Sequence, residues 1–298
     1  MTGRIRRATV AALLAVVTAM TLSPAAARAA VLPPDNYCPD GQASCVDATI
    51  AEMRQRFEPL GRSCHHNAVF ALAYLRTTQT YKWARDQSGF FADPAWVNHE
   101  DAVFAAYYFT AYDDWAAGRR AAVPQAWLIA LDAARDRRVT GAGDVMLGMN
   151  AHINRDLPFV LAAIGLTRPD GSSRKPDHDK VNDFLRLVGD PLLAEEAVRF
   201  DPFSFASLGS GVMFSVLVQW RERAWQNAER LVAAPDDAAR AAVAADIESA
   251  AATEALSLRT LNAYVPPFTT TWPRDLYCAG HHATAPPQPY PFGTPSAY

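Results

Sequence analysis

The stretch DVMLGMNAHINRDLPFVLAAI, residues 144–164, is strongly apolar at both ends and polar at its centre. Its length and the apolar residues on both sides of the polar centre predict a long buried helix. A buried helix takes polar side chains only where they find partners, because an unpaired polar group in the interior costs free energy. Pro158 follows the polar centre directly and is expected to kink the helix there and to free a backbone carbonyl.

The remaining chain predicts further helices, separated by breaks rich in Pro, Gly and Asp. Alternating runs of β-branched residues are scarce, so few strands are expected. The pattern predicts an all-α single domain over residues 31–264, with long helices packed around residues 144–164. A Pro- and aromatic-rich tail, residues 265–298, is expected to run extended over the surface. The other expected helices cover residues 46–57, 66–85, 98–115, 125–135, 176–188, 192–199, 211–231 and 238–262.

The first thirty residues read as a secretory signal peptide. Three Arg residues precede the apolar run Val10–Leu22, and Ala27-Arg28-Ala29 fits a cleavage signal, so cleavage is expected near Ala29. The pair Arg6-Arg7 leaves a twin-arginine signal open, which would mean export in a folded state. No later stretch approaches the ~20 apolar residues of a membrane span. The sequence therefore predicts an extracellular protein without a membrane span.

Charge and cysteine content fit that compartment. Cleavage would leave 24 basic and 31 acidic side chains, a net charge of −7, which argues against a nucleic-acid partner. Four Cys residues remain after cleavage, and an even number in an oxidising compartment favours two disulfides. Of the three pairings, we favour Cys38–Cys45, a tight local loop, with Cys64–Cys278, which would tie the tail to the first core helix.

The polar centre of residues 144–164 is the first candidate site. His152 and Asp156 are four residues apart and share one helix face, so together they could bind one divalent ion. The same residues would also suit a structural network in which Asp156 orients His152. Both interpretations stay open here. The candidate catalytic residues are Asn150, His152, Asn154, Arg155 and Asp156.

Two further clusters could complete a metal site. His178, Asp179 and Asn182 lie near the start of an expected helix, where acidic residues also offset the helix dipole. His99 and Asp101 follow Asn98, which is a plausible N-cap, and Asp101 is itself expected to cap the helix. The candidate metal ligands are His152, Asp156, His178, Asp179 and His99, and residue types alone do not separate zinc from iron.

The chain resembles an uncharacterised, mostly actinobacterial helical family, DUF5995. The resemblance rests on Phe104-Ala with Tyr108-Phe109, on Gly148-Met-Asn-Ala-His-Ile-Asn with Asp156-Leu-Pro158, and on His178-Asp179 with Val181-Asn182. It extends roughly over residues 66–230. It implies the all-α fold and the position of the site, and it implies no reaction.

The run His152-Ile-Asn-Arg-Asp156-Leu-Pro is also faintly similar to the His-x-x-x-Asp helix of the zinc phospholipase C and P1-type nuclease superfamily. That similarity would make His152 and Asp156 zinc ligands and would place His178 and Asn182 on a following ligand helix. The chain departs from that pattern because residues 159–161 contain no further His. The expected amino terminus, Ala30 or Val31, also lacks the Trp ligand of that superfamily.

Two functions remain open on these residues. The first is an exported metal-dependent hydrolase of esters or phosphoesters, in which zinc or iron activates a bound water. Asn150, Asn154 or Arg155 would then steady the developing oxyanion. The second is a non-catalytic binding or structural protein, in which the polar helix centre is a buried hydrogen-bond network. An oxygenase with a His/carboxylate iron site is a further alternative.

Overall fold

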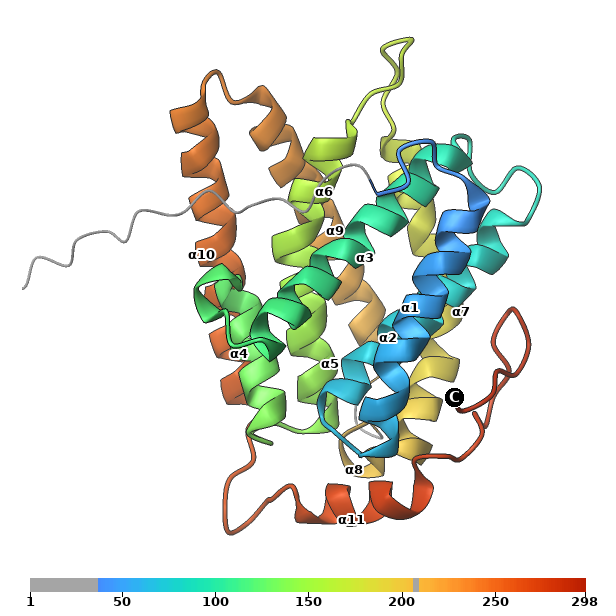
Figure 1. The fold of residues 1–298 in the computed structure, drawn as a ribbon, viewed down its shortest axis with the longest axis vertical. Helices are drawn as coiled ribbons and strands as arrows, with labels where there is room; N and C mark the ends of the chain where they lie inside the picture. Colours follow the sequence, from blue (N-terminus) through green and yellow to red (C-terminus); the bar gives the residue numbers. More distant parts are fainter. Residues whose placement is uncertain (1–36, 206–208) are drawn as a thin grey trace, which may run out of the picture.

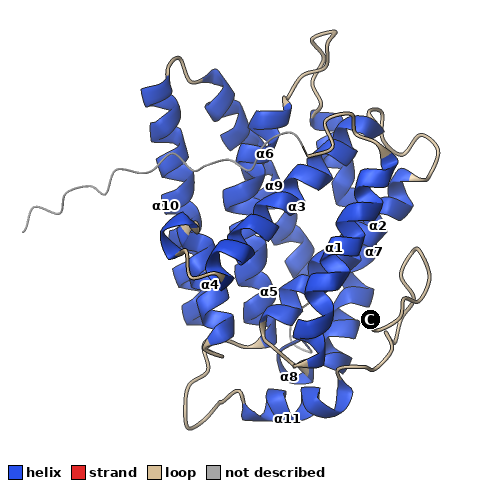
Figure 2. Ribbon diagram, in the orientation of Figure 1, coloured by secondary structure: helices blue, strands red, loops and turns tan. Residues whose placement is uncertain are grey.

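The computed structural model describes residues 37–205 and 209–298, and within them every regular element is a helix (Figure 2). Only three isolated β-bridges occur there, with no strand or sheet. The all-α prediction is confirmed, whereas the predicted signal peptide lies outside the described residues. None of the described helices is long and apolar enough to cross a membrane. The outer helices are α1 (Ala43–Arg62), α2 (Asn67–Arg85), α3 (Pro94–Ala116), α4 (Gln125–Arg135), α7 (Lys175–Arg199), α8 (Pro202–Phe205), α9 (Ser210–Ala233), α10 (Asp237–Leu261) and α11 (Trp272–His281), with a 3₁₀ turn η1 at Arg120–Ala122.

The segment around which the fold is built runs through the middle of the bundle. It consists of α5 (Gly141–Met149), a π-helical turn η2 (Asn150–Asp156) and α6 (Leu157–Ile164), which the sequence analysis predicted as one helix. All seven residues of η2 are buried, and η2 packs against α3, α4, α9 and α10 (Figure 1). The π turn ends at Asp156, two residues before Pro158, whose missing N–H leaves a carbonyl one turn earlier without its helical partner.

Several predicted helix boundaries were wrong, and the helix expected over residues 46–57 is α1, which continues through Pro59 to Arg62. Helix α3 begins at Pro94, and Asp93 is its N-cap, because its carboxylate accepts a hydrogen bond from the Trp96 backbone N–H. Asn98 instead lies one turn inside the helix and is buried, where it accepts a hydrogen bond from the Tyr81 hydroxyl. Helix α7 also continues through Pro191, which the sequence analysis placed in a break.

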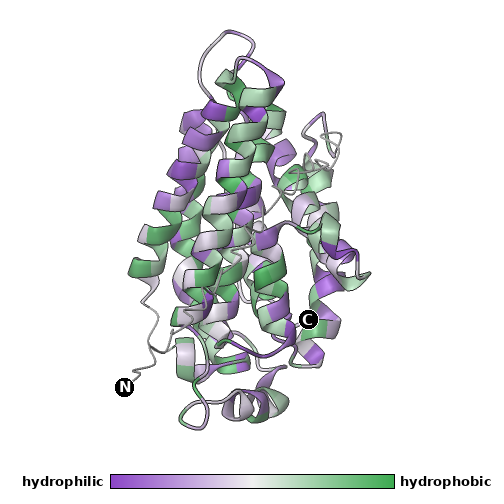
Figure 3. Cartoon of the chain, turned by 90° about the vertical axis from the view of Figure 1, so that its left-hand side faces the viewer, coloured by the Kyte–Doolittle hydropathy of each residue, from purple (hydrophilic) through white to green (hydrophobic). Residues whose placement is uncertain are grey.

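The continuation of α7 follows from packing. Pro191 removes one helical hydrogen bond, from the carbonyl of Leu187, whose side chain lies on the exposed face of the helix. Val188 and Leu192 on either side are buried in the core, so the packed face holds the helix together across the proline. Hydrophobic and hydrophilic residues alternate along the helices (Figure 3), as expected of helices that bury one face.

Two disulfides join Cys38 to Cys45 and Cys64 to Cys278, which confirms the favoured pairing. The second bond fixes the tail against the start of α2, and α11 crosses one end of the bundle (Figure 1). The tail was predicted to be extended, and outside α11 it contains no helix or strand. The sequence analysis did not predict α11. Two of its residues, Arg274 and Cys278, are buried against the body.

Candidate functional site

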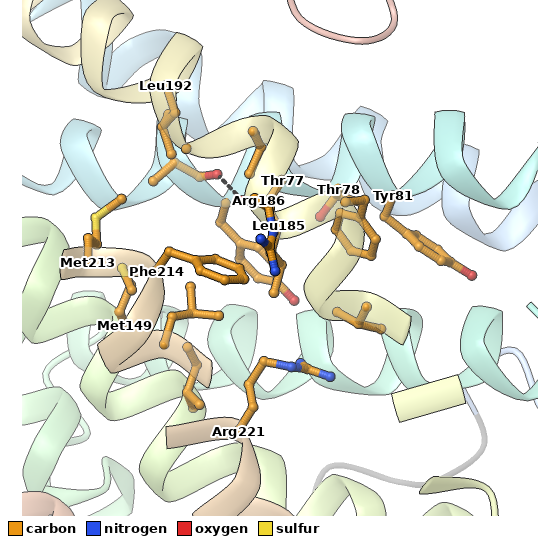
Figure 4. A pocket seen from close by; sticks show the side chains of 18 of the residues that line it. Thr77, Thr78, Tyr81, Met149, Leu185, Arg186, Leu192, Met213, Phe214 and Arg221 are labelled. Carbon is orange, nitrogen blue, oxygen red and sulfur yellow. Dashed lines mark hydrogen bonds between the residues drawn. The ribbon is translucent and has the colours of Figure 1, made fainter. Parts of the chain in front are cut away.

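A largely apolar cavity of about 390 Å³ lies between α2, α3, α7, α9 and the central segment. Its size is within the range of small-molecule sites in proteins. Figure 4 shows side chains of α2, α7 and α9 converging on it, with Met149 from the end of α5. Most of the lining is apolar, and the titratable residues that line it are Tyr74, Tyr81, Glu100, Asp101, His152, Arg186, Asp190 and Arg221.

Helical spacing explains how these side chains reach one space. The lining residues of α2 recur at intervals of three and four, as do those of α3, so each helix presents one continuous stripe to the cavity. The two helices run antiparallel, because Tyr81 bonds Asn98 at one end and Tyr74 packs against Phe104 at the other. The α2 stripe is Phe70, Ala73, Tyr74, Thr77, Thr78 and Tyr81, and the α3 stripe is Val97, Glu100, Asp101 and Phe104.

His152 joins the cavity to a buried carboxylate. Its Nδ1 lies 3.0 Å from Oδ2 of Asp156, and both side chains are almost fully buried. Burial lowers the pKa of His152 below its ordinary value, although the bond to Asp156 opposes that shift. The imidazole is therefore neutral at pH 7, with Nδ1–H donating to Asp156. Its Nε2 is buried and has no hydrogen-bond partner.

Asp156 is held in turn by two other donors. The indole Nε1 of Trp127 donates to Oδ2 at 2.8 Å, and Arg155 donates to Oδ1 at 3.0 Å. Arg155 also pairs with Glu248 of α10, at 2.6 Å. These contacts fix the carboxylate and, through it, the orientation of the His152 ring.

Asn150 and Asn154 belong to the scaffold of the turn rather than to the cavity. Asn150 donates to the backbone carbonyl of Ala251 in α10, and Asn154 donates to the side-chain oxygen of Asn150. Asn150, Asn154 and Arg155 are not among the residues that line the cavity. Of the five predicted catalytic residues, the structure therefore brings only His152 to the cavity wall, with Asp156 directly behind it.

The structure adds four polar residues to the cavity wall. Tyr74, Thr78, Glu100 and Asp101 each have a buried side-chain oxygen without a hydrogen-bond partner. Burial, together with the charge of Glu100, raises the pKa of Asp101 to about 8. The sequence analysis interpreted Asp101 as a helix cap and, with His99, as part of a possible metal site, and it missed Tyr74 and Thr78. Tyr74 and Thr78 are one turn apart on an otherwise apolar face of α2, and that pattern in the sequence could have indicated them.

Of the five predicted metal ligands, the structure brings only His152 and Asp156 together. Asp179 is exposed and accepts hydrogen bonds from Lys175, while His99 and His178 do not line the cavity. His178 lies instead against Arg221, whose guanidinium donates to its Nδ1 at 3.1 Å. Among residues 37–205 and 209–298, no group of three His, Cys, Asp or Glu side chains is arranged to hold a metal ion. In the structure both Asp156 oxygens accept hydrogen bonds, one of them from His152 itself.

The fold and cavity define a class: an all-α protein with a single helical body and an apolar small-molecule cavity. A model for a family of unknown function, DUF5995, matches residues 46–261, and the chain belongs to this family. The match spans the helices from α1 to α10 and includes every residue that lines the cavity. No curated protein and no solved structure matches the chain.

Proposed function

We propose that the protein is an exported hydrolase of small, largely apolar esters, with His152 as the general base. The observation that carries the proposal is the His152–Asp156 pair, which leaves a neutral, unpartnered Nε2 at the wall of an apolar cavity. A neutral imidazole held by a carboxylate is the commonest protein group for taking a proton at neutral pH.

The reaction follows from the groups around that nitrogen. Nε2 of His152 takes a proton from a water molecule as the water oxygen forms a bond to the ester carbonyl carbon. The hydroxyl of Tyr74, whose ring packs against His152, donates a hydrogen bond to the developing oxyanion. Burial raises the pKa of Tyr74 well above its ordinary value, so its hydroxyl keeps the proton that it donates. The bond between the former carbonyl carbon and the alkoxy oxygen of the ester then breaks. The leaving alkoxide takes the proton from His152.

Export is part of the proposal. Two disulfides among the described residues are typical of oxidising compartments. Zinc or iron at His152 stays a separate prediction, which metal analysis of the purified chain by mass spectrometry tests. No step above requires a metal ion.

The test is hydrolysis of p-nitrophenyl esters from acetate to decanoate by three purified chains. The wild type should turn over an intermediate chain length best, because the cavity limits the acyl group. His152→Gln should lower kcat by about 10²–10⁴-fold, the contribution expected of a general base. His66→Gln is the matched control, because His66 is also buried and also bonded to an aspartate through Nδ1, but does not line the cavity.

Two outcomes would reject catalysis. The first is that the wild type does not exceed buffer with any ester, and the second is that His152→Gln keeps full activity while circular dichroism shows the native helix content. The apolar lining favours a second function in the first case, which is small-molecule binding without chemistry. Saturable binding of an uncleavable ester analogue would then identify it.

A further inference from the structure

The cavity has an acidic end that the proposed hydrolysis does not use. Glu100 and Asp101 are consecutive on α3, and both line the cavity. Oε2 of Glu100 and Oδ2 of Asp101 are buried without a hydrogen-bond partner. A buried carboxylate oxygen is costly to leave unpaired, so two adjacent ones at one cavity wall are available to hydrogen-bond donors of a bound molecule.

A third oxygen lies at the same level of the cavity. Helices α2 and α3 run antiparallel, and Tyr74 of α2 packs against Phe104 of α3, with ring centroids 5.9 Å apart. Thr78 follows Tyr74 by one helical turn, and Glu100 precedes Phe104 by one turn. The unpartnered Oγ1 of Thr78 therefore belongs to the same level of the cavity as the acidic pair, about one turn away from His152, which packs on Tyr74 and Phe104.

The hydrogen-bonding capacity of these oxygen atoms indicates which chemical group would bind here. The two carboxylates are acceptors, and a hydroxyl such as that of Thr78 can also accept. The matching group is rich in N–H donors and carries a positive charge. The aromatic rings of Tyr74, Tyr81 and Phe104 line the same region and favour a cation further.

Two basic groups act on Glu100, because its Oε1 lies 3.9 Å from Nδ1 of His178 and its charge interacts with the guanidinium of Arg221, whereas its Oε2 has no hydrogen-bond partner. Arg221 lines the cavity, but its Nε donates to Asn182 and its second guanidinium nitrogen to His178. Arg186 lies over the ring of Phe214, 4.8 Å from its centroid. Asp101 keeps its proton more readily than an ordinary carboxyl in the empty cavity, because its pKa is raised, and a bound cation would favour its ionised form.

We propose that Glu100 and Asp101 bind a primary ammonium group on an otherwise apolar small molecule. This inference rests on the proposed function, since it names the substrate class of the same cavity: an apolar ester that carries an amine about one helical turn from the bond that is cleaved. The apolar remainder of the molecule would lie against side chains of α7 and α9, such as Leu185, Leu192 and Phe214.

The test compares three probes of equal chain length, n-octylammonium, n-octanol and octanoate, by isothermal titration calorimetry on the purified chain. The ammonium should bind at least tenfold more tightly than the alcohol, and octanoate should bind most weakly. Glu100→Gln with Asp101→Asn should remove that preference while the alcohol still binds. Asp179→Asn, at an exposed carboxylate paired with Lys175, is the control and should keep it.

Equal affinities for ammonium and alcohol, or no saturable binding of the ammonium, would overturn the inference. Survival of the preference in the double variant would overturn it as well. The proposed function fails separately: ester hydrolysis that depends on His152 without any ammonium preference rejects only the inference. A preference for the ammonium without hydrolysis rejects only the reaction.

Discussion

The imidazole of His152 lies flat against the ring of Phe104, with ring centroids 3.4 Å apart and ring planes 1° from parallel. The two residues come from η2 and α3, 48 positions apart in the chain. Together with the bond from Nδ1 to Asp156, this stacking leaves the ring little freedom to rotate. The unpartnered Nε2 therefore keeps a fixed place at the cavity wall, as a general base requires.

Two buried histidines should titrate on opposite sides of the ordinary pKa of 6.5. His152 has its pKa lowered by burial, whereas His66 has its pKa raised because Asp144 and Asp275 together outweigh burial. The measurement is an NMR titration of the ring protons, with His152→Gln and His66→Gln used to assign the signals.

The same shifts set opposite effects of pH on stability. The folded state resists protonation of His152, so this residue makes the protein less stable as the pH falls below 6.5. The contribution of His66 is complete below pH 6.5 and is lost as the pH rises through its folded pKa. A folded His152 pKa above 6.5 would contradict the neutral imidazole on which the proposed reaction depends.

Asp101→Asn should stabilise the protein. The pKa of Asp101 is about 8 in the folded state against an ordinary 3.8, so stability falls as the pH rises between these values. The substitution removes that loss, and the gain should reach about 1–3 kcal/mol at pH 8, a typical cost of burying an unsatisfied polar group. Urea unfolding at pH 5 and pH 8 measures it. Asp179→Asn, at an exposed position, should show no such gain, and an equal gain there would argue against a burial effect.

Asp156→Asn should destabilise the protein strongly. Its carboxylate accepts hydrogen bonds from His152, Trp127 and Arg155 in the interior, and the amide cannot accept all of them. Breaking a buried ion pair typically costs about 3–5 kcal/mol. The matched control is Glu248→Gln, which removes the other, partly exposed partner of Arg155 and should cost about 1 kcal/mol or less. Chemical denaturation of both variants tests the difference, and similar losses would mean that Asp156 is not the centre of the network.

Gly148→Ala should destabilise by about 1–3 kcal/mol, the cost of overpacking a core. A Cβ at Gly148 would lie 2.3 Å from the ring of Phe70, which is itself packed against His152 and Trp127. Gly189→Ala in the middle of α7 is the control, because the nearest atom to its Cβ would be 3.9 Å away. That variant should gain about 0.5–1 kcal/mol from helix propensity. Thermal unfolding that shows the same sign for both would contradict this account of the packing.

Local patterns in the sequence predicted much of the fold. Apolar periodicity predicted the all-α class and the central position of residues 144–164. The even number of cysteines predicted two disulfides, and the short spacing of Cys38 and Cys45 favoured the pairing that the structure shows. The patterns failed at Pro191 and Asn98, because packing on distant helices decided those positions. The sequence pattern did not predict helix α11, because only Arg274 and Cys278 are buried in it. Two buried residues are too few to produce a periodic apolar pattern.

The sequence by itself determined the His152–Asp156 pair, because four residues on a helix place both side chains on one face. It did not determine what the pair faces. Only the tertiary structure brought Thr78, Glu100 and Asp101 to the same cavity as His152, and only it placed Asp179 outside. The reason is physical: spacing along one helix fixes a face, whereas the contents of a cavity depend on how several helices are packed around it.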